Sequence, residues 1–184
     1  MISYKKMTKS DFPEWFRLYE EYLNSGDYIE DTLRRSMESP HFVGIKAEDE
    51  GKMIGFLSGT DEMEFTYPHE AKYRRIMNVI DDEKYFSPDS LLVLPEYRGN
   101  GIADTMMDQM KDILHKKRYK YFAVEIWVYA DGRSPARIPY ERMGEVLYKE
   151  RAPLFYRKSK KYGIKCPICG ENCKCGALLE VMKL

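Results

Sequence analysis

The feature that most limits how this chain can fold is a fully apolar run that passes through a glycine-containing turn into an amphipathic series. The run Leu91–Leu94 has the character of a central strand, and Pro95 ends it. After Gly101 the apolar side chains recur at offsets of three, four and one, which places them on one helical face. These side chains are Ile102, Ala103, Met106, Met107, Met110, Ile113 and Leu114. The pattern predicts a buried strand that leads directly into a long helix.

The junction between this strand and this helix favours an anion. The first turn of a helix has about four backbone N–H groups without intrahelical partners, and the helix dipole adds positive potential there. Gly99 and Gly101 would let the backbone approach an anion closely, and the small Ala103 would not crowd it. The segment has neither the Gly-Lys-Ser/Thr ending of a Walker loop nor the G-x-G-x-x-G fingerprint of dinucleotide-binding folds. It therefore indicates a phosphate site of another kind, or a turn that serves only the topology.

Hydrophobic periodicity predicts further elements on both sides of the junction. The expected helices are Phe12–Leu23, Tyr28–Glu38 and Pro135–Met143, and the polar segment after Asp61 could hold a short helix around Ala71–Ile80. The expected strands are Ile2–Met7, a hairpin of His41–Glu48 with Lys52–Thr60, the buried run Tyr119–Tyr129, and a final hairpin of Glu145–Lys149 with Leu154–Lys158. Strands that alternate with helices in this way predict an α/β chain.

Composition and charge narrow the possible functions. Lys plus Arg and Asp plus Glu each number 30 among the 184 residues, and the zero formal charge argues against a globally basic nucleic-acid binder or a polybasic membrane protein. The longest nearly uninterrupted apolar run, Tyr121–Ala130, is much shorter than the roughly 20 residues of a membrane helix. Polar residues from Thr8 to Asp11 stand where a signal peptide would need an apolar core, which favours a cytoplasmic location.

All the cysteines lie close together near the end of the sequence: Cys166, Cys169, Cys173 and Cys175. We therefore expect one main domain over residues 1–160 and a cysteine-rich tail over residues 161–184. Four thiolates at C-x2-C and C-x-C spacing match the ligand set of structural zinc, although the second spacing differs from that of a zinc ribbon. Redox-active cysteines and inert packing are the alternatives. Without a metal or a disulfide, so short a tail would not bury enough surface to order itself.

Two charged segments each admit two interpretations. Basic residues alternate with Tyr156 and Tyr162 just before the cysteines. Such a stretch beside a zinc site could bind nucleic acid, but a solvated linker is the simpler interpretation and we expect no nucleic-acid partner. Acidic residues between Asp61 and Glu83 either line an entrance that attracts cationic amines or form a solvated loop.

The turn and the region after it resemble the GNAT superfamily of acyl-CoA-dependent N-acyltransferases. The motif A pattern of that family, Arg/Gln-x-x-Gly-x-Gly/Ala, is matched by Arg98, Gly101 and Ala103. The A-x-x-x-Y-x-x-x-G segment that follows is matched at Ala136, Tyr140 and Gly144. The resemblance covers roughly residues 1–158. Glu145 stands where the family usually has phenylalanine and Arg133 where asparagine is common, and both differences concern the acceptor side.

This resemblance implies a mixed, mostly antiparallel central sheet flanked by helices, with acyl-CoA between two splayed central strands. The backbone of Leu91, Leu92 and Val93 would pair with the pantetheine arm of acetyl-CoA. The backbone N–H groups that would cradle its pyrophosphate, next to the motif residue Arg98, are those of Gly99, Asn100, Gly101, Ile102, Ala103 and Asp104. The thioester would lie where the strand of Val93 parts from the strand of Ile126.

Acyl transfer from a thioester to an amine requires a proton donor and a proton acceptor. Tyr140, at the tyrosine of the motif, would protonate the departing thiolate as a general acid; the alternative is that it only packs, as one of 15 tyrosines. Candidate bases are Asp89, Glu125 and Glu83. Glu125 interrupts an apolar strand, where a carboxylate is costly unless it is functional or paired with a lysine.

The sequence therefore predicts an N-acyltransferase that moves an acetyl group from acetyl-CoA to a primary amine. Because no cysteine lies near the expected site, we expect direct attack in a ternary complex. The acceptor stays open among a polyamine, an aminoglycoside, a free amino acid and a protein amine. The alternative is a non-catalytic acyl-CoA-binding or regulatory module whose cysteine-rich tail contacts a partner.

Overall fold

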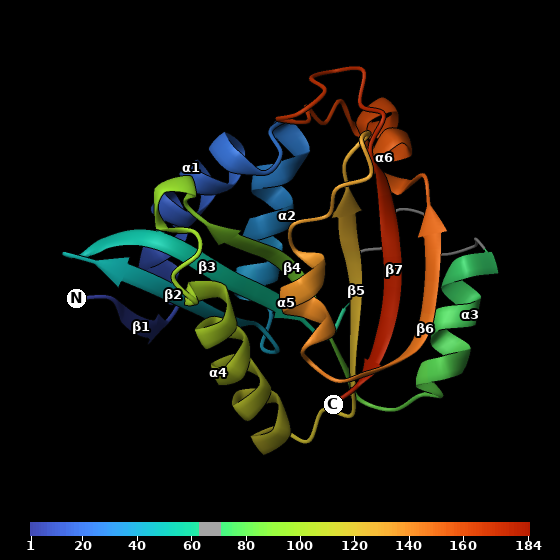
Figure 1. The fold of residues 1–184 in the computed structure, drawn as a ribbon, viewed down its shortest axis with the longest axis horizontal. Helices are drawn as coiled ribbons and strands as arrows, with labels where there is room; N and C mark the ends of the chain where they lie inside the picture. Colours follow the sequence, from blue (N-terminus) through green and yellow to red (C-terminus); the bar gives the residue numbers. More distant parts are fainter. Residues whose placement is uncertain (63–70) are drawn as a thin grey trace.

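A computed structural model describes residues 1–62 and 71–184 (Figure 1). Its strands form one seven-stranded sheet in the order β1-β2-β3-β4-β5-β7-β6. The strands are β1 (Ser3–Lys6), β2 (Val43–Asp49), β3 (Lys52–Thr60), β4 (Tyr85–Val93), β5 (Tyr121–Val128), β6 (Glu145–Ala152) and β7 (Gly176–Lys183). Only β4 and β5 pair in parallel; the other neighbours are antiparallel. The expected mixed, mostly antiparallel sheet is confirmed.

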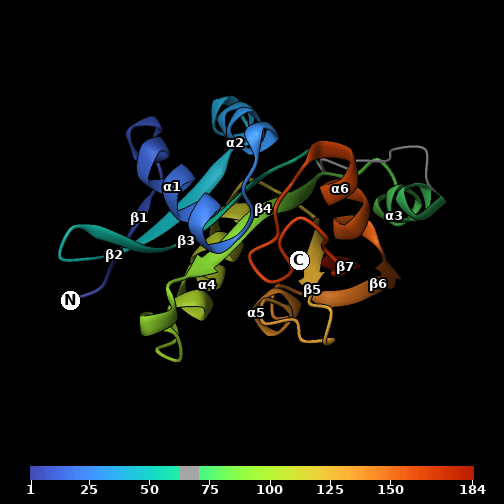
Figure 2. The ribbon, with the colours of Figure 1, turned by 90° about the horizontal axis from the view of Figure 1, so that it is seen from above.

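Helices cover both faces of this sheet. They are α1 (Phe12–Tyr22), α2 (Asp27–Glu38), α3 (Ala71–Ile80), α4 (Ile102–Lys116), α5 (Arg137–Glu141) and α6 (Leu154–Tyr162). The view from above places α1, α2, α3 and α6 on one face and α4 and α5 on the other (Figure 2). No helix within the described residues is long and apolar enough to cross a membrane.

The helices α1 to α4 are held against the sheet by their apolar stripes. On α1 and α2, Trp15, Leu18 and Leu33 are at most 2% exposed and pack with Phe56 of β3 and Leu92 of β4. The predicted stripe of α4 lies on the opposite face, where the buried Met106, Met107 and Met110 pack against the central strands. Ile76 and Ile80 of α3 cover β5 and β7 from the α1 and α2 side. The core thus lies in two layers, one on each side of the sheet.

The structure corrects the end of the predicted chain order. Residues 154–158 were expected as a strand, but they begin α6, which follows Pro153 and ends at Gly163 in the left-handed conformation. Lys160 and Lys161 lie in its last turn, where the helix dipole favours positive charge. The same finding replaces the solvated linker expected before the cysteines with a helix.

The strand that pairs with β6 is instead β7, which the sequence reasoning did not identify. β7 lies between β5 and β6 and pairs with both along its whole length. Its residues Ala177–Met182 are all buried, and apart from Glu180 they are apolar, as in a central strand. The last part of the predicted tail therefore belongs to the sheet, and the sheet does not end at residue 160.

Candidate functional site

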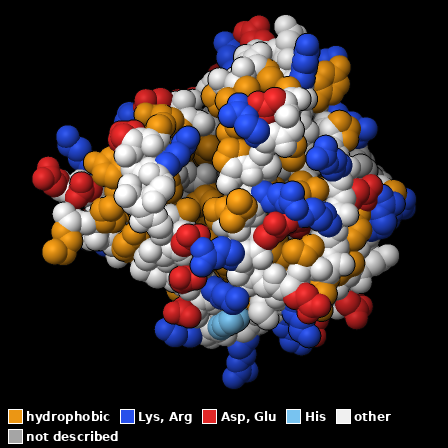
Figure 3. Space-filling model, viewed as in Figure 1, with side chains coloured by type: hydrophobic (Ala, Val, Ile, Leu, Met, Phe, Trp, Pro, Cys, Tyr) orange, Lys and Arg blue, Asp and Glu red, His pale blue; other side chains and the backbone are white. Residues whose placement is uncertain are grey.

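The central feature of the site is the divergence of β4 from β5. The two strands pair only at Tyr85 with Tyr121 and at Phe86 with Phe122, and beyond these pairs they part toward the top of Figure 1. In the space-filling view of this face, hydrophobic side chains show in the hollow between the two halves of the molecule (Figure 3). The splayed central strands that the sequence led us to expect are present.

The backbone of β4 offers alternate residues to the two sides of this opening. The Leu94 N–H donates to the Ile54 carbonyl oxygen of β3 at 2.9 Å. Because backbone directions alternate along a strand, the N–H and C=O of Leu92 also face β3, whereas those of Leu91 and Val93 face the opening. The expectation that all three residues pair with a pantetheine arm is therefore corrected for Leu92, whose side chain is buried under α1 and α2.

The turn after β4 presents a row of backbone N–H groups at one end of the opening. Gly99 and Gly101 have φ angles of +80° and +72°, and Gly101 is the N-cap of α4. The Asn100 side-chain amide donates to the Tyr97 carbonyl oxygen at 3.0 Å and so holds the turn. Thr105 is the first residue of α4 whose N–H bonds back into the turn, to the Gly101 carbonyl at 3.0 Å. The amides of residues 99–104 find no backbone acceptor among the described residues, as expected of an anion cradle.

The glycines are needed here because of the backbone angle. A Cβ atom added at Gly99 or Gly101 would meet no protein atom within 4 Å. An L-residue in the left-handed region is strained even in open space. Only glycine therefore holds this turn at no conformational cost.

Two arginines flank the cradle. The Arg98 guanidinium donates through Nε to the Val93 carbonyl oxygen at 2.9 Å, so the motif arginine ties the turn to the end of β4. Arg142, which the sequence reasoning missed, lies with Nη1 2.7 Å from Oδ1 of Asp104 in the first turn of α4. Its only sequence signal was its place two residues after the motif tyrosine. Arg142 thus links α5 to the first turn of α4, where its charge is paired with that of Asp104.

Tyr140 lies on α5, which covers the gap between β4 and β5 (Figure 1). Its side chain is only 5% exposed, and its ring centroid lies 5.8 Å from that of Phe122 at the closed end of the opening. Burial raises the pKa of the Tyr140 phenol, and the charges of Asp89 and Tyr19 raise it further. The phenol therefore stays protonated at neutral pH, which is the state that a proton donor needs.

The three candidate bases occupy different places. Asp89 of β4 accepts a hydrogen bond from the Ser36 hydroxyl of α2, and its charge acts on Tyr140. Glu125 is half-buried on β5 and, by strand alternation, shares a face with Trp127, opposite the face that meets α4 and α5. Glu83 forms an ion pair with Lys120 at the closed end of the two strands, away from the opening. The structure thus keeps Asp89 and Glu125 as candidates and removes Glu83.

A buried ion-pair network holds α5 against the sheet. Glu180 of β7 is fully buried, and Lys149 Nζ of β6 lies 2.6 Å from its Oε1 and 2.5 Å from Oε1 of Glu141. Hydrogen bonds from Lys149 and Arg137 lower the pKa of Glu141 to about 2, and burial raises the pKa of Glu180. Because Glu141 is next to Tyr140, this network fixes the segment that carries the candidate acid.

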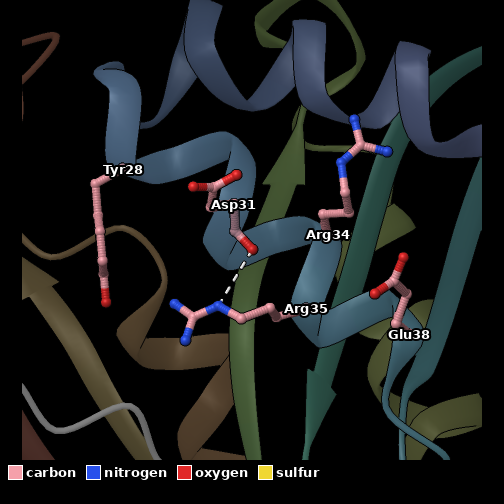
Figure 4. Close-up of a pocket in the computed structure, with 5 residues that line it drawn as sticks. All are labelled: Tyr28, Asp31, Arg34, Arg35 and Glu38. Atoms are coloured by element: carbon pink, nitrogen blue, oxygen red, sulfur yellow. Dashed lines mark hydrogen bonds between the residues drawn. The ribbon is translucent and has the colours of Figure 1, made fainter.

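On the opposite face of the sheet, α2 carries a shallow groove of about 300 Å³. Its lining residues all come from this one helix: Tyr28, Asp31, Arg34, Arg35 and Glu38 (Figure 4).

The acidic entrance considered for residues 61–83 is only partly described, because residues 63–70 lie outside the described part of the chain. Oδ2 of Asp61 lies 3.1 Å from Nδ1 of His41.

The four cysteines converge between α6 and β7, where they form what we call the cysteine knuckle, residues 166–175. Their Sγ atoms all lie within 4.8 Å of one another, with Cys175 Sγ 3.9 Å from that of Cys166 and 3.6 Å from that of Cys169. Four thiolates about 2.3 Å from a tetrahedral zinc ion lie about 3.8 Å apart, so the donor set fits this metal.

The backbone around the knuckle also suits thiolate ligands. The N–H groups of Ile168 and Cys169 donate to Cys166 Sγ at 3.4 Å each. Gly170, with a φ of +68°, turns the chain so that its backbone and that of Cys166 bond in both directions. None of the four cysteines forms a disulfide, and all but Cys169 are buried. The arrangement is a preformed four-sulfur site, as a structural metal requires.

The arrangement of the sheet and its helices is also found in solved structures. The fold is similar to that of the ribosomal-protein-S18-alanine N-acetyltransferase of Escherichia coli, with a TM-score of 0.66, 14% identity, and coverage of 100% of this chain and 94% of that one. It is also similar to Arabidopsis thaliana NAA60 in complex with acetyl-CoA, with a TM-score of 0.67, 15% identity, and coverage of 100% and 99%. These two similarities show that the chain shares the fold of these N-acetyltransferases.

The sequence assigns the chain more narrowly. Residues 4–144 match the acetyltransferase (GNAT) family, and the chain belongs to this family. A further similar structure is AAC(6')-Iy in complex with a bisubstrate analogue, with a TM-score of 0.54, 14% identity, and coverage of 78% of this chain and 90% of that one. A search of curated proteins gave no significant match.

Proposed function

We propose that this protein transfers an acetyl group from acetyl-CoA to a primary amine by direct attack within a ternary complex. The observation that carries this proposal is that the opening between β4 and β5 has the amide cradle of residues 99–104 at its diverging end and the buried Tyr140 near Phe122 at its closed end. Family membership supports acetyl-CoA as the donor. The pyrophosphate would meet the N–H groups at the start of α4, and the pantetheine arm would run along the edge of Leu91 and Val93.

The two faces of the opening supply the two proton-transfer groups. Tyr140 approaches from the α5 face, and Asp89 is held by Ser36 of α2 on the other. The acceptor amine would enter from the α2 face and form a bond to the carbonyl carbon as the C–S bond breaks. Asp89, or Glu125 on the same face, would take the amine proton, and Tyr140 would give its proton to the departing thiolate. The protonated carboxyl group then releases its proton to solvent and the phenolate recovers one, so the protein returns unchanged.

The test uses Tyr140→Phe, with Tyr4→Phe as the matched control because Tyr4 lies half-buried on β1, remote from the opening. Titration calorimetry with acetyl-CoA comes first, followed by thiol release against polyamines, aminoglycosides, amino acids and a peptide with a free N-terminus. We expect Tyr140→Phe to lose roughly 10²- to 10⁴-fold in turnover while its acetyl-CoA affinity stays within about twofold. Unchanged turnover would remove Tyr140 from the mechanism. Tight acetyl-CoA binding with no thiol release for any amine would favour the non-catalytic binding module.

We also propose that the cysteine knuckle binds one structural zinc ion. The sulfur separations and the N–H groups directed at Cys166 support this proposal. Thiolate ligands persist in a reducing compartment, in keeping with a cytoplasmic location. Elemental analysis of protein purified without chelator should give about one zinc per chain. Protein that purifies without metal, and whose stability does not change when zinc is added, would contradict the proposal.

A further inference from the structure

The cysteine knuckle contacts the two halves of the molecule that the diverging strands separate. On the β1–β4 side, residues 162–165, which lead directly into the knuckle, meet the turn between α1 and α2 and the start of α2. The backbone of Lys165 and that of Ser25 bond in both directions, at 2.9 and 3.2 Å. Tyr162 stacks on Tyr28 with ring centroids 4.6 Å apart, and Ile164 is buried in the core under α1 and α2. The segment that leads into the knuckle is therefore joined to the α1–α2 turn and to the first turn of α2 by backbone bonds, an aromatic stack and apolar burial.

On the β5–β7 side, the knuckle is continuous with the sheet. Trp127 of β5 packs against the four cysteines, and Cys175 immediately precedes β7. The Tyr156 N–H of α6 donates to the Cys175 carbonyl oxygen at 3.2 Å. The knuckle is therefore anchored to β5, which borders the opening, and to β7 beside it.

These contacts matter because the sheet itself joins the two halves only at the closed end of the opening. The two β4–β5 pairs lie at Tyr85 and Phe86, whereas Figure 1 shows the knuckle at the opposite end, above the diverging strands and between α2 and α6. On the basis of the proposed function and its zinc site, we infer that the metal-bound knuckle is a clasp, meaning a link between the two halves at the open end of the splayed strands. It holds the α1–α2 turn to the C-terminal half of the sheet and so fixes the acceptor side of the site.

The clasp reaches a candidate catalytic group through one helix. α2 begins two residues after Ser25 and carries Ser36, whose hydroxyl holds the Asp89 carboxylate. A shift of the α1–α2 turn would therefore move the partner of Asp89. The cradle at α4 lies on the other face of the sheet and has no contact with the knuckle among the interactions of the described residues. The metal should thus act on the acceptor side and leave cofactor binding unchanged.

The deciding measurement is hydrogen exchange, because it needs no acceptor. We expect the amides of Ser25 and Lys165, which bond across the clasp, to exchange at least about tenfold faster when zinc is removed by chelation. The amides of Leu94 and Thr105, at the cradle end of β4 and in α4, should keep their rates. Titration of the stripped protein with acetyl-CoA should give an affinity within about twofold of that of the zinc-loaded protein.

A variant separates the clasp from the metal. Tyr162→Ala removes the stack on Tyr28 but no sulfur, so it should retain zinc and still speed exchange at Ser25; Tyr162→Phe should restore the protection. Unchanged exchange at Ser25 and Lys165 in stripped protein would overturn the clasp while leaving the zinc proposal intact. Protein that never takes up zinc would overturn both. Loss of acetyl-CoA affinity on stripping would show general loosening and would also overturn the clasp.

Discussion

Replacement of Gly101 by alanine tests whether the turn before α4 holds the cofactor. Gly101 has a φ of +72°, and a Cβ added there meets nothing within 4 Å, so the substitution changes only the backbone preference. Holding an L-residue in this conformation costs about 1–2 kcal/mol. Because the turn is exposed and makes no packing contact at this position, we expect a local change in its backbone conformation to relieve the strain. To bind acetyl-CoA, the turn would have to return to the strained conformation. Acetyl-CoA binding would therefore be weaker by the same free energy, a factor of about 5–30 in affinity.

Gly51→Ala is the matched control. Gly51 has a φ of +80°, also with nothing within 4 Å of an added Cβ, but it lies in the hairpin between β2 and β3. Both variants carry the same strain, and Gly51→Ala should show it only as a melting temperature lower by about 2–8 °C. Titration calorimetry with acetyl-CoA should show weaker binding for Gly101→Ala alone. If Gly101→Ala binds acetyl-CoA as tightly as Gly51→Ala does, the turn is not the cradle.

Two further predictions concern stability. Glu48 is 7% exposed, and hydrogen bonds from Lys46 and then Lys5 lower the pKa of its carboxyl group. The contribution of Glu48 to stability is therefore complete above the unfolded pKa of about 4.5 and is lost as the pH falls below that value. Urea unfolding should show Glu48→Gln less stable than the native chain at pH 7, with the difference closing below about pH 4.5, whereas the exposed Glu145→Gln should show little difference at either pH. A pH-independent difference would contradict the ion-pair explanation. Gly144→Ala would place a Cβ 1.8 Å from the Lys183 carbonyl oxygen and should cost at least about 1–3 kcal/mol in unfolding free energy, and a native-like urea midpoint would show that β7 does not pass so close.

The parts of the structure that the sequence predicts well are those set by local pattern. The apolar run from Leu91 and the helical stripe after Gly101 describe a strand and a helix whose burial does not depend on distant residues. The cradle follows from the same segment, because a helix N-terminus has free amides wherever it occurs. The four cysteines were found by their spacing alone, and the structure brings their sulfur atoms together.

The parts that were missed depend on contacts between distant segments. Residues 154–158 have a composition that suits either a strand or a helix. Because β7 pairs with β6, residues 154–158 are not needed as a partner strand, and only the assembled sheet shows this. Ser36 is an ordinary helix serine until α2 is packed over Asp89. Glu180 interrupts an apolar run, and its partner Lys149 lies on a neighbouring strand that register alone brings alongside. No single-sequence pattern encodes such pairs.

The position of β7 has a consequence for how the chain assembles. It is the last strand in chain order, yet it lies between β5 and β6, which both leave the ribosome earlier. Because chains are synthesised at about 5–20 residues per second, β5 and β6 stay without β7 for seconds. During this time their open edges could pair with another chain. The cysteine knuckle is synthesised just before β7, so a metal bound there would hold the start of β7 close to β5 and β6. Loss of the knuckle should therefore appear during synthesis as aggregation, before any effect on the finished protein can be measured.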